Sequence, residues 1–167
     1  MLRDPRTTDR PHCESLLPGQ VWEVTHTSGH RFAPTSVLLP SGTLHGRLDI
    51  AAATGVLVAA EHGQTVLAGS RGRSTWPAAA QVAELAVREA SAETSLTALT
   101  LTAHDQAGVD EWLTEIAHED GSTWRVRIEA RESDVRRTTS RVVRQGTEAD
   151  DVPHHPAPVA FARGPNL

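Results

Sequence analysis

One run of alternating side chains constrains the fold of this chain more than any other feature of its sequence. In residues 123–131, every second position is apolar and the positions between are occupied by arginine or glutamate. Successive side chains of a strand point to opposite faces, so this pattern predicts a strand with one packed face and one solvated face. Residues 111–117 also alternate, and the segment HEDGS between the two contains the Asp-Gly pair of a tight turn. We therefore expect an antiparallel hairpin.

Two helices are expected before this hairpin. Residues 50–62 follow Asp49, which can accept hydrogen bonds from the first turn, and precede Gly63, which can end the helix. A second helix opens at Trp76-Pro77, with Ser74 or Thr75 as its cap. Apolar and β-branched runs predict strands over residues 20–25, 32–39, 44–48, 65–67 and 96–103.

The order of these elements predicts an α/β or α+β layered domain in one folded unit. Residues 1–19 contain three prolines and little apolar periodicity, so we expect a flexible lead-in. The folded domain is expected over residues 20–132. Residues 133–167 lose the periodicity and become rich in proline and acidic residues, so we expect a disordered tail there.

Charge and hydropathy exclude several classes of function. The formal net charge is −5, so the chain has no basic surplus with which to neutralise phosphates, and nucleic-acid binding is disfavoured. No apolar run approaches the roughly 20 residues that a membrane helix needs. The first residues lack the apolar core of a secretory signal, so a cytoplasmic protein is expected without membrane contact. Nothing in the sequence defines an oligomeric state.

The segment THTSGHRF, residues 25–32, holds the densest group of chemically useful side chains. His26 and His30 are four residues apart, and two neutral imidazoles aimed at one point could bind iron, zinc, copper or nickel. Two histidines hydrogen-bonded at the end of a strand explain the same pattern, and the residues alone leave both interpretations open. Cys13 is the single cysteine, so a disulfide within the chain is impossible.

A longer stretch carries a resemblance to a known family. Residues 21–49, VWEVTHTSGHRFAPTSVLLPSGTLHGRLD, resemble the signature of the sucraseferredoxin-like family. The similarity continues in RGRS at residues 71–74, in WP at 76–77 and in QVAELAVRE at 81–89. It returns in HEDG at 118–121 and WRV at 124–126, so it covers about residues 20–131.

The resemblance implies a thioredoxin-like layered sheet with helices that carries a [2Fe–2S] cluster. In the family two cysteines from an upstream loop and the two histidines of H-x3-H hold the cluster, which places His26 and His30 as ligands here and makes Cys13 a candidate third. The implied function is electron transfer to a redox partner protein, not catalysis. Replacing two thiolates with imidazoles raises the reduction potential of such a cluster. The RGRS loop is a candidate docking element or anion site.

This sequence departs from the family before Gln20, where the pair of cysteines and the first βα unit are missing. Either the natural protein starts upstream of Met1, or the chain is a remnant of the family. Two other functions therefore stay open: a cluster-free protein with a scaffold or partner-binding role, and a mononuclear metal site at the histidine pair. No pair of carboxylates is arranged as a glycosidase requires, so no sucrase activity is expected.

Other conspicuous side chains are expected to be structural. The four tryptophans should lie in the core, because their spacing follows the predicted strands. His45 and His62 fall at the ends of elements and should lie on the surface. His118 and Asp120 belong to the hairpin turn.

Overall fold

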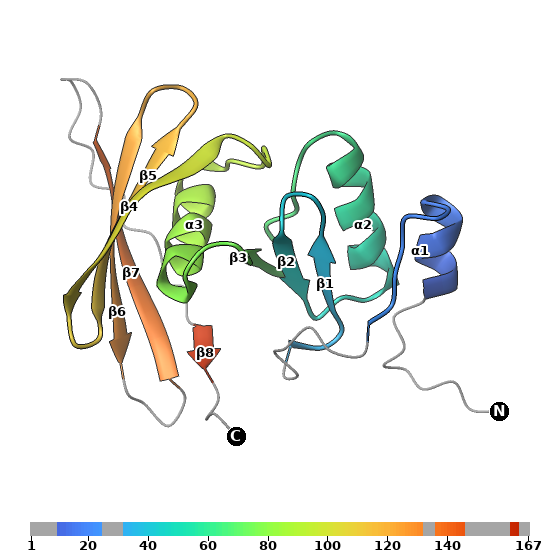
Figure 1. The fold of residues 1–167 in the computed structure, drawn as a ribbon, viewed down its shortest axis with the longest axis horizontal. Helices are drawn as coiled ribbons and strands as arrows, with labels where there is room; N and C mark the ends of the chain where they lie inside the picture. The colour runs from blue at the N-terminus through green and yellow to red at the C-terminus, as the bar shows by residue number, and fades with distance from the viewer. Residues whose placement is uncertain (1–9, 25–31, 132–135, 146–160, 164–167) are drawn as a thin grey trace.

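The computed structural model describes residues 10–24, 32–131, 136–145 and 161–163. Within these residues the chain forms three helices and two antiparallel sheets, so the fold is a mixed α/β fold. Figure 1 shows the two sheets side by side along the long axis, with helix α3 between them.

The larger sheet has five strands in the order β4-β5-β6-β7-β8. Their bounds are Leu99–Gly108 (β4), Glu111–His118 (β5), Thr123–Arg131 (β6), Arg136–Gln145 (β7) and Phe161–Arg163 (β8). The predicted hairpin is confirmed: β5 pairs with β6 in one unbroken register, from Glu111 opposite Glu129 to Ala117 opposite Thr123. Trp124, Val126 and Ile128 of β6 are buried and Arg125 and Arg127 are exposed, as the alternation predicts.

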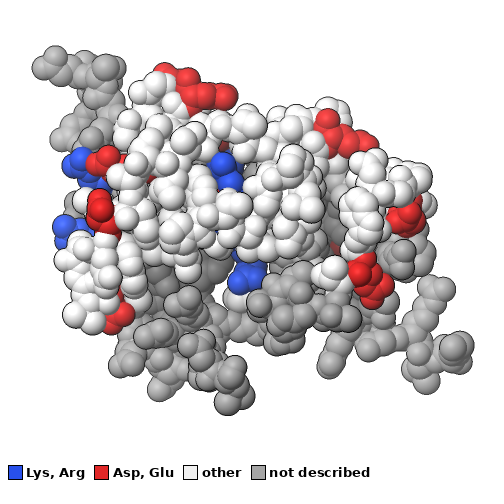
Figure 2. All heavy atoms as spheres, in the orientation of Figure 1, with Lys and Arg blue, Asp and Glu red and all other residues white. Residues whose placement is uncertain are grey.

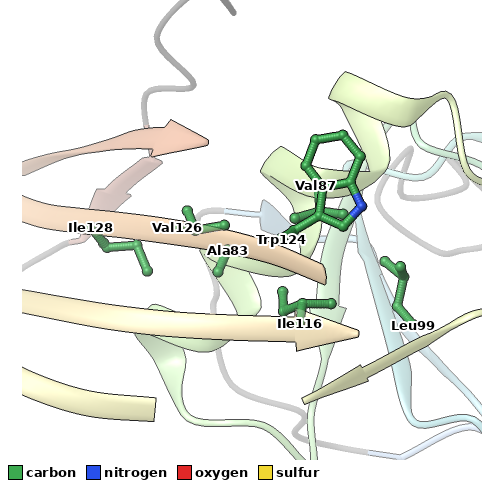
Figure 3. Packing of buried hydrophobic residues seen from close by; sticks show 7 residues of the cluster. All are labelled: Ala83, Val87, Leu99, Ile116, Trp124, Val126 and Ile128. Atoms are coloured by element: carbon green, nitrogen blue, oxygen red, sulfur yellow. The ribbon is translucent and has the colours of Figure 1, made fainter. Parts of the chain in front are cut away.

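Helix α3, Ala78–Ser91, covers the packed face of this sheet. Figure 3 shows the resulting core, in which side chains from three strands meet those of the helix. Its buried members are Ala83, Val87, Leu99, Ile116, Trp124, Val126 and Ile128. Each fully buried aliphatic side chain contributes about 1.5–3 kcal/mol, so this cluster is the main apolar source of stability.

The smaller sheet has the order β1-β2-β3, with bounds Thr35–Leu38, Thr43–Gly46 and Ser70–Arg73. Helix α2, Ile50–Glu61, follows the β1-β2 hairpin, and helix α1, Arg10–Leu16, packs against α2. This half of the molecule lies on the other side of α3 from the larger sheet in Figure 1.

The two long helices begin differently. Asp49 caps α2 as predicted, because its Oδ1 accepts a hydrogen bond of 2.8 Å from the Ala52 backbone N–H. Helix α3 begins directly after Pro77, and no side chain caps it. The predicted caps Ser74 and Thr75 are therefore wrong.

Several expected elements differ in the structure. Residues 71–74 read as a polar turn, but Ser70–Arg73 form strand β3. The small residues Ser70 and Gly72 face inward, and burial of such residues leaves no apolar signal in the sequence. Residues 65–67 form no strand, and neither do residues 20–24.

The expected lead-in and tail also contain regular structure. Helix α1 lies within residues 1–19, and strands β7 and β8 lie within residues 133–167. Strand β7 pairs with β6 over nine residue pairs, from Thr123–Gln145 to Arg131–Arg137. Its sequence, RRTTSRVVRQ, lacks an apolar alternation that could have predicted it.

Burial corrects two further expectations. Trp22 is 74% exposed and is not a core residue, whereas Trp124 is buried and Trp76 and Trp112 pack against the core. His45 is fully buried, not a surface residue. Among the described residues, no helix is long and apolar enough to span a membrane.

Candidate functional site

The histidine pair at the centre of the predicted metal site, His26 and His30, lies outside the described residues. The described chain ends on one side at Val24 and resumes at Phe32. On the first side, Trp22 is 74% exposed and Val24 is 62% exposed. The segment that precedes the H-x3-H motif therefore presents apolar side chains to solvent.

Cys13, the third candidate ligand, lies in helix α1 and is buried. Its neighbour His12 fixes the helix against α2, since His12 Nε2 lies 3.0 Å from Thr54 Oγ1. The side chain of Cys13 is 8% exposed, and buried thiols are less reactive than exposed ones.

These donors do not fit a [2Fe–2S] cluster held by one chain. Such a cluster takes four ligands, and mixed Cys/His ligation needs two thiolates. The whole sequence has one cysteine. Among the described residues, no group of three or more His, Cys, Asp or Glu side chains lies close enough together to hold a metal ion.

Phe32 lies two residues after His30, and the side chains of two arginines lie over its ring. The Arg71 guanidinium carbon lies 4.2 Å from the centre of the Phe32 ring, and that of Arg47 lies 5.7 Å from it. Both distances are in the range of cation–π attraction. The Arg47 backbone N–H also donates a 2.6 Å hydrogen bond to the Phe32 carbonyl.

Gly46 makes this stack possible. A Cβ on Gly46 would lie 2.9 Å from the Phe32 Cβ and 3.0 Å from its carbonyl oxygen. Any other residue would therefore displace Phe32. Arg47, the next residue, has a φ of 58°, a left-handed conformation that is uncommon outside glycine.

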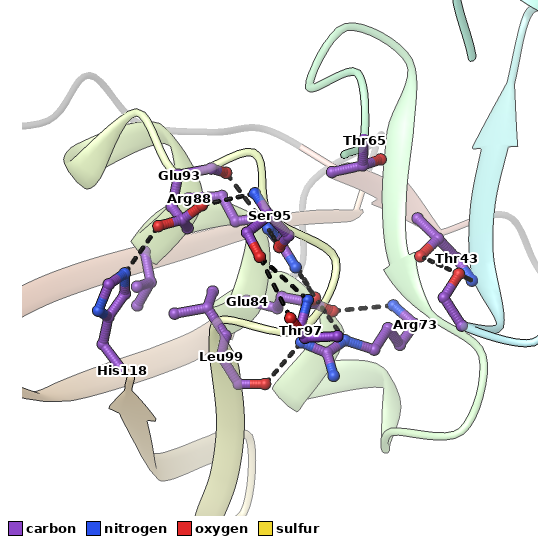
Figure 4. A network of polar contacts seen from close by, with 12 residues as sticks. Thr43, Thr65, Arg73, Glu84, Arg88, Glu93, Ser95, Thr97, Leu99 and His118 are labelled. Atoms are coloured by element: carbon purple, nitrogen blue, oxygen red, sulfur yellow. Dashed lines mark hydrogen bonds and ion pairs between the residues drawn. The ribbon is translucent and has the colours of Figure 1, made fainter. Parts of the chain in front are cut away.

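A second cluster, shown in Figure 4, joins the two halves of the molecule. Glu84 of α3 is 1% exposed, and its Oε1 accepts hydrogen bonds from Arg73 of β3 and from Arg88 one turn along the helix. The Arg73 Nη2 also donates to the Leu99 carbonyl of β4, at 2.7 Å. This carboxylate bridges two guanidiniums from different elements, so we assign the cluster a structural role.

The same contacts show how Arg73, one residue of the predicted anion site at 71–74, is engaged within the protein. The Arg73 Nε lies 2.8 Å from Glu84, and its guanidinium lies over the Trp76 ring at 4.5 Å. The Nε and Nη2 of Arg73 thus already donate hydrogen bonds within the protein, to Glu84 and to the Leu99 carbonyl. Arg73 therefore belongs to the structural cluster.

His118 forms a contact that turn chemistry alone does not predict. Its Nε2 lies 2.7 Å from Glu93 Oε2, in the loop that follows α3. The hydrogen bond to Glu93 raises the pKa of His118, and burial opposes that shift only in part. The pair is therefore a titratable link between the hairpin and the helix.

Three buried or stacked groups have partners on other elements, which the sequence alone does not bring together. Glu84 lies within a helical pattern, His45 within a short strand, and Phe32 beside the histidine motif. Only Glu84 offered a signal, because a glutamate on the apolar face of a helix calls for a cationic partner.

Comparison with known proteins identifies no relative: no family model, no curated protein and no solved structure matches this chain.

Proposed function

We propose that this chain is a sucraseferredoxin-like protein with a partner-binding role that builds no [2Fe–2S] cluster by itself. The observation that carries the proposal concerns Cys13, its number and its burial. It is the one thiol of the sequence, and it lies buried in α1. The resemblance of residues 20–131 to the family supports the assignment, and the ligand count argues against a cluster in a single chain.

The thioredoxin-like fold is part of this proposal. The β1-β2 hairpin followed by α2 supports it, because a layered domain without its first βα unit would keep a hairpin and a helix in this order. All pairings between the described strands are antiparallel.

Electron transfer through a [2Fe–2S] cluster is the competing function. It would need thiolates from a second chain in addition to His26 and His30. A mononuclear metal site at the same two histidines is a third function, and it would need no thiolate at all.

The test is the metal and acid-labile sulfide content of the full chain, purified without oxygen and without a histidine tag. We expect a colourless protein without stoichiometric iron or sulfide, also after anaerobic reconstitution. Equal amounts of iron and sulfide with visible absorption would overturn the proposal in favour of electron transfer. Zinc or copper without sulfide would indicate the mononuclear site.

Matched variants separate specific from adventitious metal. Substitutions His26→Ala and His30→Ala should remove any metal held by the motif, whereas His62→Ala, on the exposed end of α2, should leave it in place. Cys13→Ala then shows whether the buried thiol contributes, with circular dichroism as the control for folding.

A further inference from the structure

A short backbone pairing connects the two halves of the molecule. It joins residues 63–65, which follow α2, to residues 94–96, which follow α3, and we call these two segments the latch. We propose that the latch opens locally when His118 at the end of β5 loses its proton, while the five-stranded sheet stays folded. The inference concerns the fold and does not depend on the proposed function.

The latch is held by few backbone contacts. The Thr65 N–H donates to the Thr94 carbonyl at 2.7 Å, and the Leu96 N–H donates to the Gly63 carbonyl at 2.9 Å. The middle residues of the two segments form an isolated antiparallel bridge. Segments with so few backbone hydrogen bonds open at a lower free energy than the paired strands of a core.

Glu93 connects the latch to the larger sheet. Its Oε2 lies 2.7 Å from His118 Nε2, and its Oε1 accepts a hydrogen bond from the Ser95 N–H inside the latch. The side chains of Glu93 and His118 are 19% and 13% exposed, so solvent and salt screen their contact only in part. One carboxylate therefore joins the imidazole to the backbone of the latch.

The charges around His118 favour its protonated form. Glu93 faces it from the loop after α3, Asp120 lies 3.0 Å from its Nδ1, and the residue opposite it in β4 is the uncharged Leu99. The hydrogen bond to Glu93 raises the pKa of the imidazole, and burial opposes this shift only in part. The latch is therefore held most firmly while His118 is charged.

Loss of the proton weakens the contact on the side of the latch. A charged donor forms hydrogen bonds about twice as strong as those of a neutral donor. The Asp120 N–H lies 3.0 Å from His118 Nδ1 and can donate to it only when that nitrogen carries no proton. The neutral imidazole thus keeps a partner in its own turn while its attraction for Glu93 falls. Glu93 then holds the Ser95 N–H less firmly.

Arg88 of α3 marks how far the opening extends, as Figure 4 shows. Its Nη1 donates to the Glu93 and Ser95 carbonyls at 3.2 and 2.8 Å, and its Nε and Nη2 donate to Glu84 on the same helix. Opening of the latch breaks the contacts to the two carbonyls but leaves the pair with Glu84 inside α3. The helix and the sheet below it therefore remain in place.

Histidines are the groups to test between about pH 6 and pH 8.5. Figure 2 shows aspartate, glutamate and arginine side chains on the face in view, and none of these residue types titrates in this range. His45 also reaches the latch, because its Nε2 lies 3.2 Å from Thr65 Oγ1. Burial lowers the pKa of His45, so it titrates at more acid pH than His118. The two histidines are thus separable by pH.

Hydrogen exchange of the ¹⁵N-labelled full chain, followed by NMR, tests the inference. The amides of Thr65 and Leu96 report on the latch, and those of Ile116 and Val126 report on the sheet. After correction for the intrinsic pH dependence of exchange, protection of the latch amides should fall about fivefold from about pH 6 to pH 8.5, the magnitude of a partly screened ion pair. The sheet amides should stay protected. The midpoint should coincide with the titration of the His118 ring signals.

Four variants make the test specific. His118→Gln keeps a donor but carries no charge, so its latch amides should show low protection at both pH values, and Glu93→Gln should behave in the same way. His104→Gln alters a histidine of β4 that contacts Thr114 and not the latch, so it should keep the pH dependence of the wild type. His45→Gln should keep it too, because His45 titrates below this range.

Three results would overturn the inference. A pH dependence of latch protection that persists in His118→Gln and Glu93→Gln would assign the response to another group. Sheet amides that lose protection to the same extent as latch amides would show global unfolding instead of local opening. A midpoint in the wild type that differs from the titration of His118 decides against the latch even if a variant does not fold.

Discussion

His118 Nε2 lies 2.7 Å from the carboxylate of Glu93, so an ion pair that depends on pH joins the end of β5 to the loop after α3. His118 also has Asp120 beside its Nδ1, at 3.0 Å. The contacts make this imidazole more basic than an ordinary one, and that shift has a measurable consequence for stability.

Stability should fall as the pH rises through the pKa of His118. The Glu93 hydrogen bond raises this pKa above 6.5 in the folded state. The contribution of the pair is therefore complete below about pH 6.5 and is lost as the pH passes the raised value. Thermal unfolding of wild type and of Glu93→Gln across this range checks the effect. The difference in melting temperature should shrink with rising pH, and a constant difference would contradict the assignment.

The titration of His45 should change stability with pH in the direction opposite to that of His118. Burial lowers the pKa of this fully buried imidazole, against a smaller opposing effect of the Val66 backbone. Its neutral form is favoured by folding, so stability is complete above about pH 6.5 and declines as the pH falls towards the lowered pKa.

The variant His45→Gln tests this sign. The glutamine side chain can still reach Thr65, whose Oγ1 lies 3.2 Å from Nε2 of His45, but a glutamine has no titratable group. Urea unfolding of the two proteins at about pH 5 and pH 7.5 should show a weaker acid dependence in the variant. A variant with an unchanged acid dependence would show that another group is responsible.

Glu84→Gln should destabilise the fold by about 3 kcal/mol or more, because it leaves the buried guanidinium of Arg88 without its carboxylate. Denaturant unfolding measures the loss. The control is Glu89→Gln on the same helix, where the side chain is exposed and the expected change is within about 0.5 kcal/mol. Equal losses of unfolding free energy in the two variants would contradict the role of Glu84 as the partner of the buried Arg88.

Two glycine substitutions should have opposite signs. Gly72 has a φ of 80°, and an added Cβ would lie 3.0 Å from the Gln81 backbone, so Gly72→Ala should cost more than the roughly 1–2 kcal/mol of a left-handed residue. Gly55 lies inside α2 with no atom within 4 Å of an added Cβ, so Gly55→Ala should stabilise by about 0.5–1 kcal/mol. Melting temperatures distinguish the two.

The comparison of sequence and structure separates local from non-local information. The β5-β6 hairpin and the Asp49 cap were predictable, because alternation and capping are written within a few neighbouring residues. Strand β3 was not, since its inward residues are small and its place depends on pairing with β2. The same holds for the candidate site, where Phe32 meets Arg71 across almost forty positions of sequence (roughly a quarter of the chain).

At Trp22 the sequence predicted a feature that the structure does not have. A large aromatic residue within an apparent strand pattern predicts burial, yet its exposed fraction is 74%. Periodicity identifies which positions could share a face, but only a partner surface can bury them. His26 and His30 lie outside the described residues, so their role as ligands stays a prediction.

The carboxylate of Glu84 is shared by Arg73 from the smaller sheet and Arg88 from the helix on the larger one. Separating the two halves of the molecule would break the Arg73–Glu84 ion pair and the Arg73–Leu99 hydrogen bond, which makes the halves poor candidates for independent domains. The protein should therefore melt as one cooperative unit, and fragments cut between β3 and α3 should recover structure only when they are mixed.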